Sequence, residues 1–246
     1  MKDINSLKVL LIQIREDVNV KKEELESFSR YSKIPQTNFE ILDVFKTYSF
    51  NNDLRDYDAV FVGGASEASV LDINKYPFVN LIMELMLKCL EVNTPVFASC
   101  FGFQVAVLAL GGKIITDKVN FEMGTIPIQI SEVAKSDLVY RNINNNFIAV
   151  SVHQEKATEL PKNCILLAKT NECIHSFKVI NKNFWAFQFH PELDKQCLTD
   201  RLNVYKEKYT EDWDHYENII KNFQETPESN LLLANFVQNV VLKSNK

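Results

Sequence analysis

The stretch PVFASCFGFQVAVLAL, residues 95–110, joins a short apolar run to a longer apolar segment that is followed by Gly111 and Gly112. Residues 95–100 have the length and composition of a buried strand. Residues 101–110 are long enough for a helix, and a glycine pair is a typical helix end. The pattern predicts a tight strand-to-helix turn at Cys100.

The segments before this turn predict an α/β sheet. LKVLLIQI, residues 7–14, is almost continuously apolar, which is typical of a strand covered by helices on both faces. The next expected elements are a helix over 18–34 closed by Pro35, a strand over 39–48, a strand over 57–64 that ends in two glycines, and a helix that starts near Pro77.

Beyond Lys113, short runs rich in branched and aromatic residues predict the strands of a mixed sheet. These runs span 113–119, 125–131, 145–154, 164–170, 174–180 and 184–190. After His190 the expected elements are helices over 194–209, 212–223 and 228–243. Because no repeat, low-complexity stretch or Pro/Gly-rich linker interrupts the chain, we expect a single domain over 1–246.

The bulk composition is that of a globular protein with a substantial core, with 46% hydrophobic and 24% charged residues. A formal net charge of -5 argues against general attraction to nucleic acid or to an anionic membrane, so small-molecule or protein partners are favoured. No targeting or membrane-spanning segment is evident, and we expect a cytoplasmic protein. The 5 cysteines lack C-x-x-C spacing, so no disulfide framework or metal site is predicted, and nothing indicates a cofactor.

Cys100 is the strongest candidate nucleophile. Ala98 and Gly102 flank it at the spacing of a sharp strand-to-helix turn, where large side chains would collide. Such a turn lifts the thiol off the backbone and places it at a helix N-terminus, which favours the thiolate. A buried structural thiol is the alternative for any single cysteine. The flanking glycine, in a chain with only 6 glycines, favours the nucleophile.

His190 and Glu192 are the candidate base and the group that orients it. His190 ends the apolar run FQF, and Pro191 fixes an extended backbone before Glu192. Side chains two residues apart in an extended segment lie on one side, so the carboxylate is expected to hold the imidazole in one tautomer. A histidine capping a loop is the alternative for this motif alone, and its combination with the Cys100 turn favours catalysis.

The other histidines carry weaker signals. His153 ends a different apolar strand, and it either faces the same cleft or is an ordinary loop histidine. We expect His175 and His215 to be structural or exposed, because the strand and the helix around them have ordinary composition.

Several motifs, taken in order, resemble the class I glutamine amidotransferase domain over roughly residues 7–193. They are AVFVGG (59–64), PVFASCFGFQ (95–104) followed by LGGKI (110–114), EMG (122–124), VHQE (152–155) and AFQFHPE (186–192). The turn and the FHPE motif are specific in combination and weak alone. Residues 194–246 form a helical extension instead of a synthetase domain, as in the free-standing, GMP-synthase-like members that include γ-glutamyl peptidases.

The resemblance implies a flavodoxin-like three-layer domain with a central mixed, mostly parallel sheet and extra C-terminal helices. It implies hydrolysis of a γ-glutamyl amide through a γ-glutamyl thioester, with Cys100 as nucleophile, His190 as general base and acid, and Glu192 as orienter. The N–H groups of Gly64 and Phe101 are the implied oxyanion hole. The candidate substrate-binding residues are Gly63, Gln104, Met123, Gly124 and His153.

Two positions depart from the family pattern. Ser99 stands where the family usually has glycine, and we expect this small residue to be tolerated with some added strain. Ala65 follows Gly63 and Gly64 where the family usually has proline, which leaves the conformation of that loop open.

The leading hypothesis is an enzyme that attacks a γ-glutamyl amide bond. If glutamine is the substrate, ammonia passes to a separate acceptor enzyme, because the chain has no recognisable synthetase domain. If the substrate is a γ-glutamyl or glutathione-like peptide, no such partner is needed. A non-catalytic binding or regulatory member of the fold is disfavoured by three competent residues at the catalytic positions. A related protease of the heat-shock type is disfavoured because Phe101 stands where that type has histidine.

Overall fold

A computed structural model describes residues 2–47, 49–204 and 220–244, and within them nine strands form one sheet in the order β2-β1-β3-β4-β11-β10-β9-β6-β7. The parallel part consists of β2 (Phe39–Asp43), β1 (Val9–Gln13), β3 (Ala59–Val62), β4 (Val96–Ser99) and β11 (Phe184–Phe187). The antiparallel part consists of β10 (Ile174–Val179), β9 (Cys164–Lys169), β6 (Glu122–Ile130) and β7 (Asn146–His153). A small separate sheet pairs β5 (Ile115–Thr116) with β8 (Glu155–Lys156).

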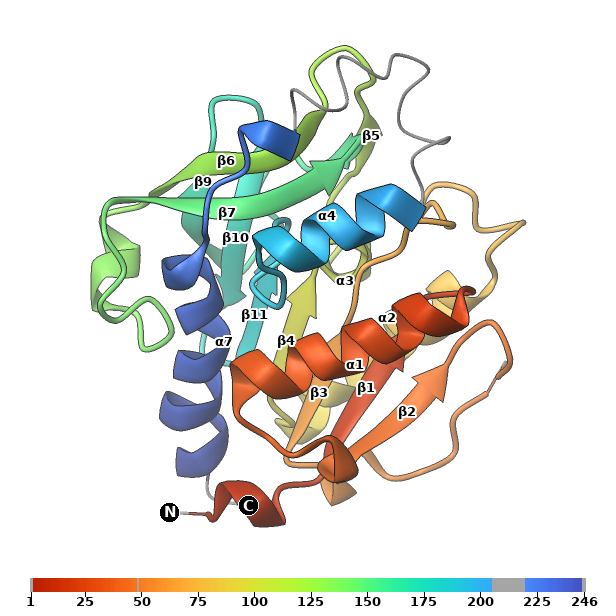
Figure 1. The fold of residues 1–246 in the computed structure, drawn as a ribbon. Helices are drawn as coiled ribbons and strands as arrows, with labels where there is room; N and C mark the ends of the chain where they lie inside the picture. Colours follow the sequence, from red (N-terminus) through yellow and green to blue (C-terminus); the bar gives the residue numbers. More distant parts are fainter. Residues whose placement is uncertain (1, 48, 205–219, 245–246) are drawn as a thin grey trace.

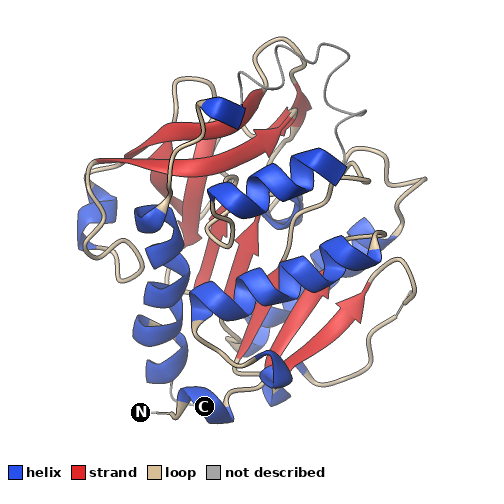
Figure 2. Ribbon diagram, in the orientation of Figure 1, coloured by secondary structure: helices blue, strands red, loops and turns tan. Residues whose placement is uncertain are grey.

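Helices cover both faces of this sheet (Figure 1). Their bounds are α1 (Val18–Ser32), α2 (Phe78–Val92), α3 (Phe101–Ala109), α4 (Lys195–Val204) and α7 (Pro227–Asn239). Helix α1 contacts α7 and α4 on one side of the sheet, and α2 contacts α3 on the other. Figure 2 shows the resulting three layers, with strands between helices. The mixed α/β architecture predicted from the sequence is confirmed.

Strand β1 shows why its sequence is almost continuously apolar. Val9 and Leu11 point into the cluster that includes Phe28 of α1, whereas Leu10 and Ile12 point into the cluster on the opposite face. All five residues of the strand are buried. The expected strand with both faces covered is confirmed.

Helix α1 begins and ends through local hydrogen bonding and backbone conformation. The Asp17 side chain accepts hydrogen bonds from the amides of Asn19 and Val20, at 2.8 and 3.0 Å, and so caps the first turn. Lys33 adopts a left-handed conformation with φ of 66°, which ends the helix at Ser32. The predicted span, 18–34, was therefore two residues too long.

Strand β2 is shorter than the predicted span of 39–48. Asp43 accepts hydrogen bonds from the backbone of the next residues: its carboxylate from the amide of Phe45, its carbonyl from the amides of Lys46 and Thr47. An aspartate that bonds the chain just beyond it favours a turn over a continuing strand.

Two of the three predicted C-terminal helices correspond to α4 and α7. Helix α4 starts at Lys195, inside the predicted span of 194–209, and α7 ends at Asn239, where a 3-10 turn over Val241–Lys243 continues the chain. Most of the predicted helix over 212–223 and the histidine at position 215 lie outside the described residues. Of the helices that the structure does describe, none combines the length and apolar content needed to cross a membrane.

The last helix is part of the main core. Phe236 of α7 lies 5.3 Å from Phe97, 5.8 Å from Trp185 and 6.1 Å from Phe61, between ring centroids, and is fully buried. Near the chain ends, the Lys2 amide donates a hydrogen bond of 3.2 Å to the Leu242 carbonyl. The C-terminal segment therefore completes one face of the sheet.

We expect Phe236→Ala to lower the free energy of unfolding by about 3–5 kcal/mol, because it removes a ring packed among three others. Urea titration followed by circular dichroism measures the loss. Leu231→Ala, on an exposed part of α7, is the control and should change stability by less than about 1 kcal/mol. A small loss for Phe236→Ala would show that α7 is not integral to the core.

Candidate active site

Cys100 lies at the turn between β4 and α3. Its backbone has φ of 51° and ψ of -102°, a strained conformation for a residue with a side chain, and its amide donates a 2.7 Å hydrogen bond to the Phe187 carbonyl of β11. Gly102 permits this turn, since a Cβ there would lie 2.8 Å from the Val62 carbonyl oxygen. The strained turn expected from the sequence is present.

His190 and Glu192 lie beside this turn, just beyond β11. The His190 amide donates to the Val150 carbonyl at 2.8 Å, and its ring Nδ1 lies 2.6 Å from Oε1 of Glu192. Both side chains are buried, Glu192 completely. With Nδ1 engaged by the carboxylate, Nε2 is the ring atom left for proton transfer.

The charges of this site shift the pKa of His190. Burial disfavours the imidazolium, but the negative charges of Cys100 and Glu192 outweigh that effect and raise the pKa of His190 to about 9. The pKa of Glu192 is lowered, because the attraction of His190 outweighs the effect of burial. The charged form of His190 is therefore favoured at neutral pH.

Gly64 is the point where these groups meet. A Cβ at this position would lie 2.7 Å from Cε1 of His190, 2.9 Å from Nη2 of Arg15 and 3.5 Å from Cβ of Cys100. Only glycine allows three side chains to approach the backbone this closely. The Gly64 backbone therefore borders both the thiol and the imidazole.

A cavity of about 370 Å³ opens in front of Cys100. Its lining includes four of the predicted site residues, Cys100, Phe101, Gln104 and His153. Gln104 donates from Nε2 to the Glu155 carbonyl at 2.8 Å, so this part of the wall is held in place. Polar residues of β7, β8 and α3 line this cavity together with Cys100.

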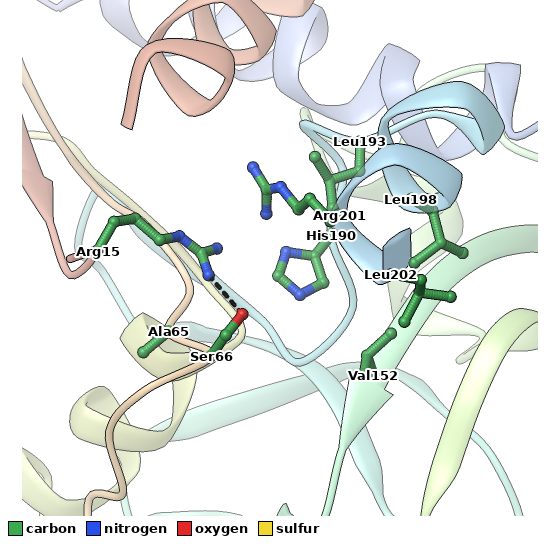
Figure 3. A pocket seen from close by; sticks show the side chains of 9 residues that line it. All are labelled: Arg15, Ala65, Ser66, Val152, His190, Leu193, Leu198, Arg201 and Leu202. Carbon is green, nitrogen blue, oxygen red and sulfur yellow. Dashed lines mark hydrogen bonds between the residues drawn. The ribbon is translucent and has the colours of Figure 1, made fainter. Parts of the chain in front are cut away.

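A second, smaller cavity of about 30 Å³ is lined by His190, Arg15 and Arg201. Figure 3 shows the guanidinium groups of Arg15 and Arg201 near the His190 imidazole, both on the same side of the ring in this view. Ala65, Ser66 and Val152 line both cavities, and apolar side chains from α4 and the loop before it complete the smaller one, namely Leu193, Leu198 and Leu202.

Three predicted substrate-binding residues, Gly63, Met123 and Gly124, are absent from the linings of both cavities. Met123 packs against the apolar cluster that contains Phe223, and a Cβ on Gly124 would lie 3.2 Å from that ring. Gly63 packs against the side chain of Glu24, since a Cβ added at Gly63 would lie 2.7 Å from Oε1 of Glu24. The contact of these three residues with substrate stays a prediction.

Arg15 is a charged residue of the site that the sequence analysis missed. It is buried, its Nε donates to Oε1 of Glu24 at 2.9 Å, and its Nη1 donates to the Ser66 hydroxyl at 3.0 Å. Burial opposes its charge, but the neighbouring carboxylates and Cys100 outweigh this and raise the pKa of Arg15 above its usual range. Its position just after a buried parallel strand was an available signal, since ligands bind at that edge of such sheets.

Arg201 was missed for a different reason. It reaches the site from α4, where its Nε donates to Oε2 of Glu23 at 2.5 Å, and its Nη2 has no partner among the described residues. A helix of mixed composition after the last motif gave no signal for it.

Comparisons with known proteins identify the family of this chain. The chain matches the family model "Glutamine amidotransferase class-I" over residues 23–201. It is 25% identical over 210 residues to the glutamine amidotransferase-like protein L716 of Acanthamoeba polyphaga mimivirus, covering 85% of this chain and 89% of that protein. It is 27% identical over 153 residues to gamma-glutamyl peptidase 4 of Arabidopsis thaliana, covering 61% of this chain and 60% of that protein.

A solved structure shares the fold. A glutamine amidotransferase from Thermotoga maritima superposes with a TM-score of 0.75 at 20% identity, covering 97% of this chain and 99% of that one. The flavodoxin-like fold expected from the sequence is thereby confirmed. Because the family model matches well over half of the residues, this chain belongs to the class I glutamine amidotransferase family.

Proposed function

We propose that this protein hydrolyses a γ-glutamyl amide bond with Cys100 as the nucleophile, His190 as the general acid and base, and Glu192 as the group that orients His190. The observation that carries this proposal is the convergence at Gly64 of the strained Cys100 turn and the buried His190–Glu192 pair. Family membership supports the same chemistry.

The first half of the reaction forms a thioester. The Cys100 thiolate attacks the γ-carbonyl carbon, and the resulting oxyanion accepts hydrogen bonds from the amides of Gly64 and Phe101. The amide of Phe101 suits this role because it follows Cys100 at the start of α3. His190 then donates its proton to the leaving nitrogen as the C–N bond breaks.

The second half releases glutamate. Neutral His190 accepts a proton from water as the water oxygen attacks the thioester carbon. Collapse of the second tetrahedral intermediate breaks the C–S bond and restores the thiolate–imidazolium pair. Glu192 keeps Nδ1 engaged throughout, so that Nε2 carries each proton.

Glutamine is the substrate that the cavities favour. The larger cavity, of about 370 Å³, has room for the γ-glutamyl group and offers Gln104 and other polar groups to its amino-acid end. The smaller cavity lined by His190, of about 30 Å³, suits a molecule the size of water or ammonia. Ammonia released there would serve a separate acceptor enzyme.

A γ-glutamyl peptide is the second candidate substrate. The similarity to a gamma-glutamyl peptidase over 61% of the chain supports it. Glutamate release from glutamine and from γ-glutamyl dipeptides, measured side by side, distinguishes the two. The substrate with the higher kcat/KM identifies the leaving group.

Cys100→Ala should reduce glutamate release by at least about 10³-fold, because no other group can form the thioester. Cys164→Ala, at a half-buried cysteine of β9, is the matched control and should retain activity. A glutamine-derived chloromethyl ketone should label Cys100 even if turnover requires a partner. If neither turnover nor labelling depends on Cys100, the protein is a non-catalytic member of the family.

Glu192→Gln should lower kcat on the order of 10²-fold to 10⁴-fold and change the pH profile. Since the pKa of His190 is raised to about 9, activity that needs the imidazolium should fall as pH rises through about 9. Removing the Glu192 charge lowers that pKa, so the fall should begin at lower pH. Glu159→Gln, at an exposed carboxylate, should leave the profile unchanged. If the activity of Glu192→Gln falls at the same alkaline pH as that of the unaltered protein, the role proposed for Glu192 is contradicted.

The combined change Arg15→Gln and Glu24→Gln should slow alkylation of Cys100 at neutral pH by about 10-fold, because a cation beside the thiolate is lost. Both residues are changed so that neither charge stays buried alone. Iodoacetamide labelling followed by mass spectrometry of the Cys100 peptide measures the rate. The control is Lys22→Gln with Glu26→Gln, an exposed ion pair on α1. Equal rates in both double variants would exclude Arg15 from thiolate stabilisation.

A further inference from the structure

A second group of reactive side chains lies behind the wall of the larger cavity. Oε2 of Glu122 lies 3.0 Å from Nε2 of His153, 2.7 Å from Nε2 of His175 and 3.6 Å from Sγ of Cys173. Their donor atoms all lie within 4.8 Å of one another. Cys173 and both histidines are buried.

The strand arrangement brings these residues together. Glu122 and His153 are direct partners in the β6–β7 pairing. Cys173 and His175 are separated by one residue at the start of β10, and side chains at that spacing point to the same face of a strand. Strand β9 ends at Lys169, where it pairs with the far half of β6, so β10 can present its first residues to Glu122.

Hydrogen bonding alone accounts poorly for this convergence. A carboxylate oxygen has two lone pairs, yet two imidazole nitrogens and one thiol sulfur approach the same oxygen. The two imidazole rings stand at 63° to each other with centroids 5.6 Å apart. Four groups that can ligate a metal therefore meet in one small volume.

We propose that Glu122, His153, Cys173 and His175 form a binding site for a divalent zinc-like ion. Two imidazoles, a thiolate and a carboxylate are a ligand set that Zn²⁺ accepts in tetrahedral geometry. From the usual Zn–ligand bond lengths, neighbouring ligand atoms in such a site lie roughly 3.3–3.7 Å apart. The separations from Glu122 are 2.7–3.6 Å and all four atoms lie within 4.8 Å of one another, so the ligand atoms would move by about 1 Å to reach that range.

The charges of the four proposed ligands also suit a divalent cation. The carboxylate and the thiolate contribute two negative charges, which offset the charge of a divalent cation at a buried position. The ion would tie β6, β7 and β10 together and fix the His153 ring, which also lines the cavity in front of Cys100. The site therefore supports the cavity wall and does not take part in the proposed reaction.

The test measures metal binding directly, in protein that carries Cys100→Ser so that the nucleophile cannot bind the metal. Metal-free protein is titrated with Zn²⁺ in competition with a coloured chelator, and with Co²⁺ followed by absorption. We expect one ion per chain, a tetrahedral cobalt spectrum and a thiolate-to-cobalt charge-transfer band. Absence of Zn²⁺ binding, or a cobalt spectrum without the thiolate band, would overturn the proposal.

Two further variants assign the ligands. Cys173→Ser and His175→Gln, each added to Cys100→Ser, should weaken Zn²⁺ binding at least about 10-fold. His175→Gln keeps a hydrogen-bond donor near Glu122, so it separates metal binding from hydrogen bonding. Cys197→Ser, a buried cysteine outside the cluster, is the control and should bind Zn²⁺ normally. Unchanged affinity in both ligand variants would place the metal elsewhere and refute the site.

Discussion

The close approach of three chain segments around Cys100 is the constraint on which the site depends. Strands β3, β4 and β11 run side by side and end at the same edge, so the segments that follow them must share one small volume. Gly102 lets α3 start against the carbonyl of Val62, and Gly64 lets His190 approach Cys100. A methyl group at Gly102 would collide with Val62, and one at Gly64 would collide with the His190 ring.

Buried charged residues surround the site, and side chains of helix α1 form ion pairs with two of them, Arg15 and Arg201. Glu24 binds Arg15 and Glu23 binds Arg201, so adjacent residues of one helix fix both guanidinium groups that line the smaller cavity with His190. A buried charge that loses its partner costs several kcal/mol, which makes these pairs sensitive to substitution on either side. Helix α1 thus supports the site without contributing a residue to the proposed reaction.

The features that local sequence determines were predictable. Continuous apolar runs identified β1 and β4, and small residues around Cys100 identified the strained turn. Asp43 accepts hydrogen bonds from the amides that follow it, and these bonds end β2 earlier than predicted. The spacing of apolar residues does not reveal that such a turn competes with strand pairing. Arg201 and the pairing of Cys173 with Glu122 depend on contacts between segments far apart in sequence, so no single stretch could indicate them. The substrate-binding role of Met123 and Gly124 rests on resemblance alone.

The hydrogen bond between Lys2 and Leu242 joins the chain ends at the amino edge of the parallel strands, whereas Cys100 lies at the carboxyl edge. An affinity tag or a reporter domain fused near either end would emerge on the side of the molecule away from the cavity. Lys2 and Leu242 are also close enough for a short linker to join them, which makes the protein a suitable scaffold for circular permutation.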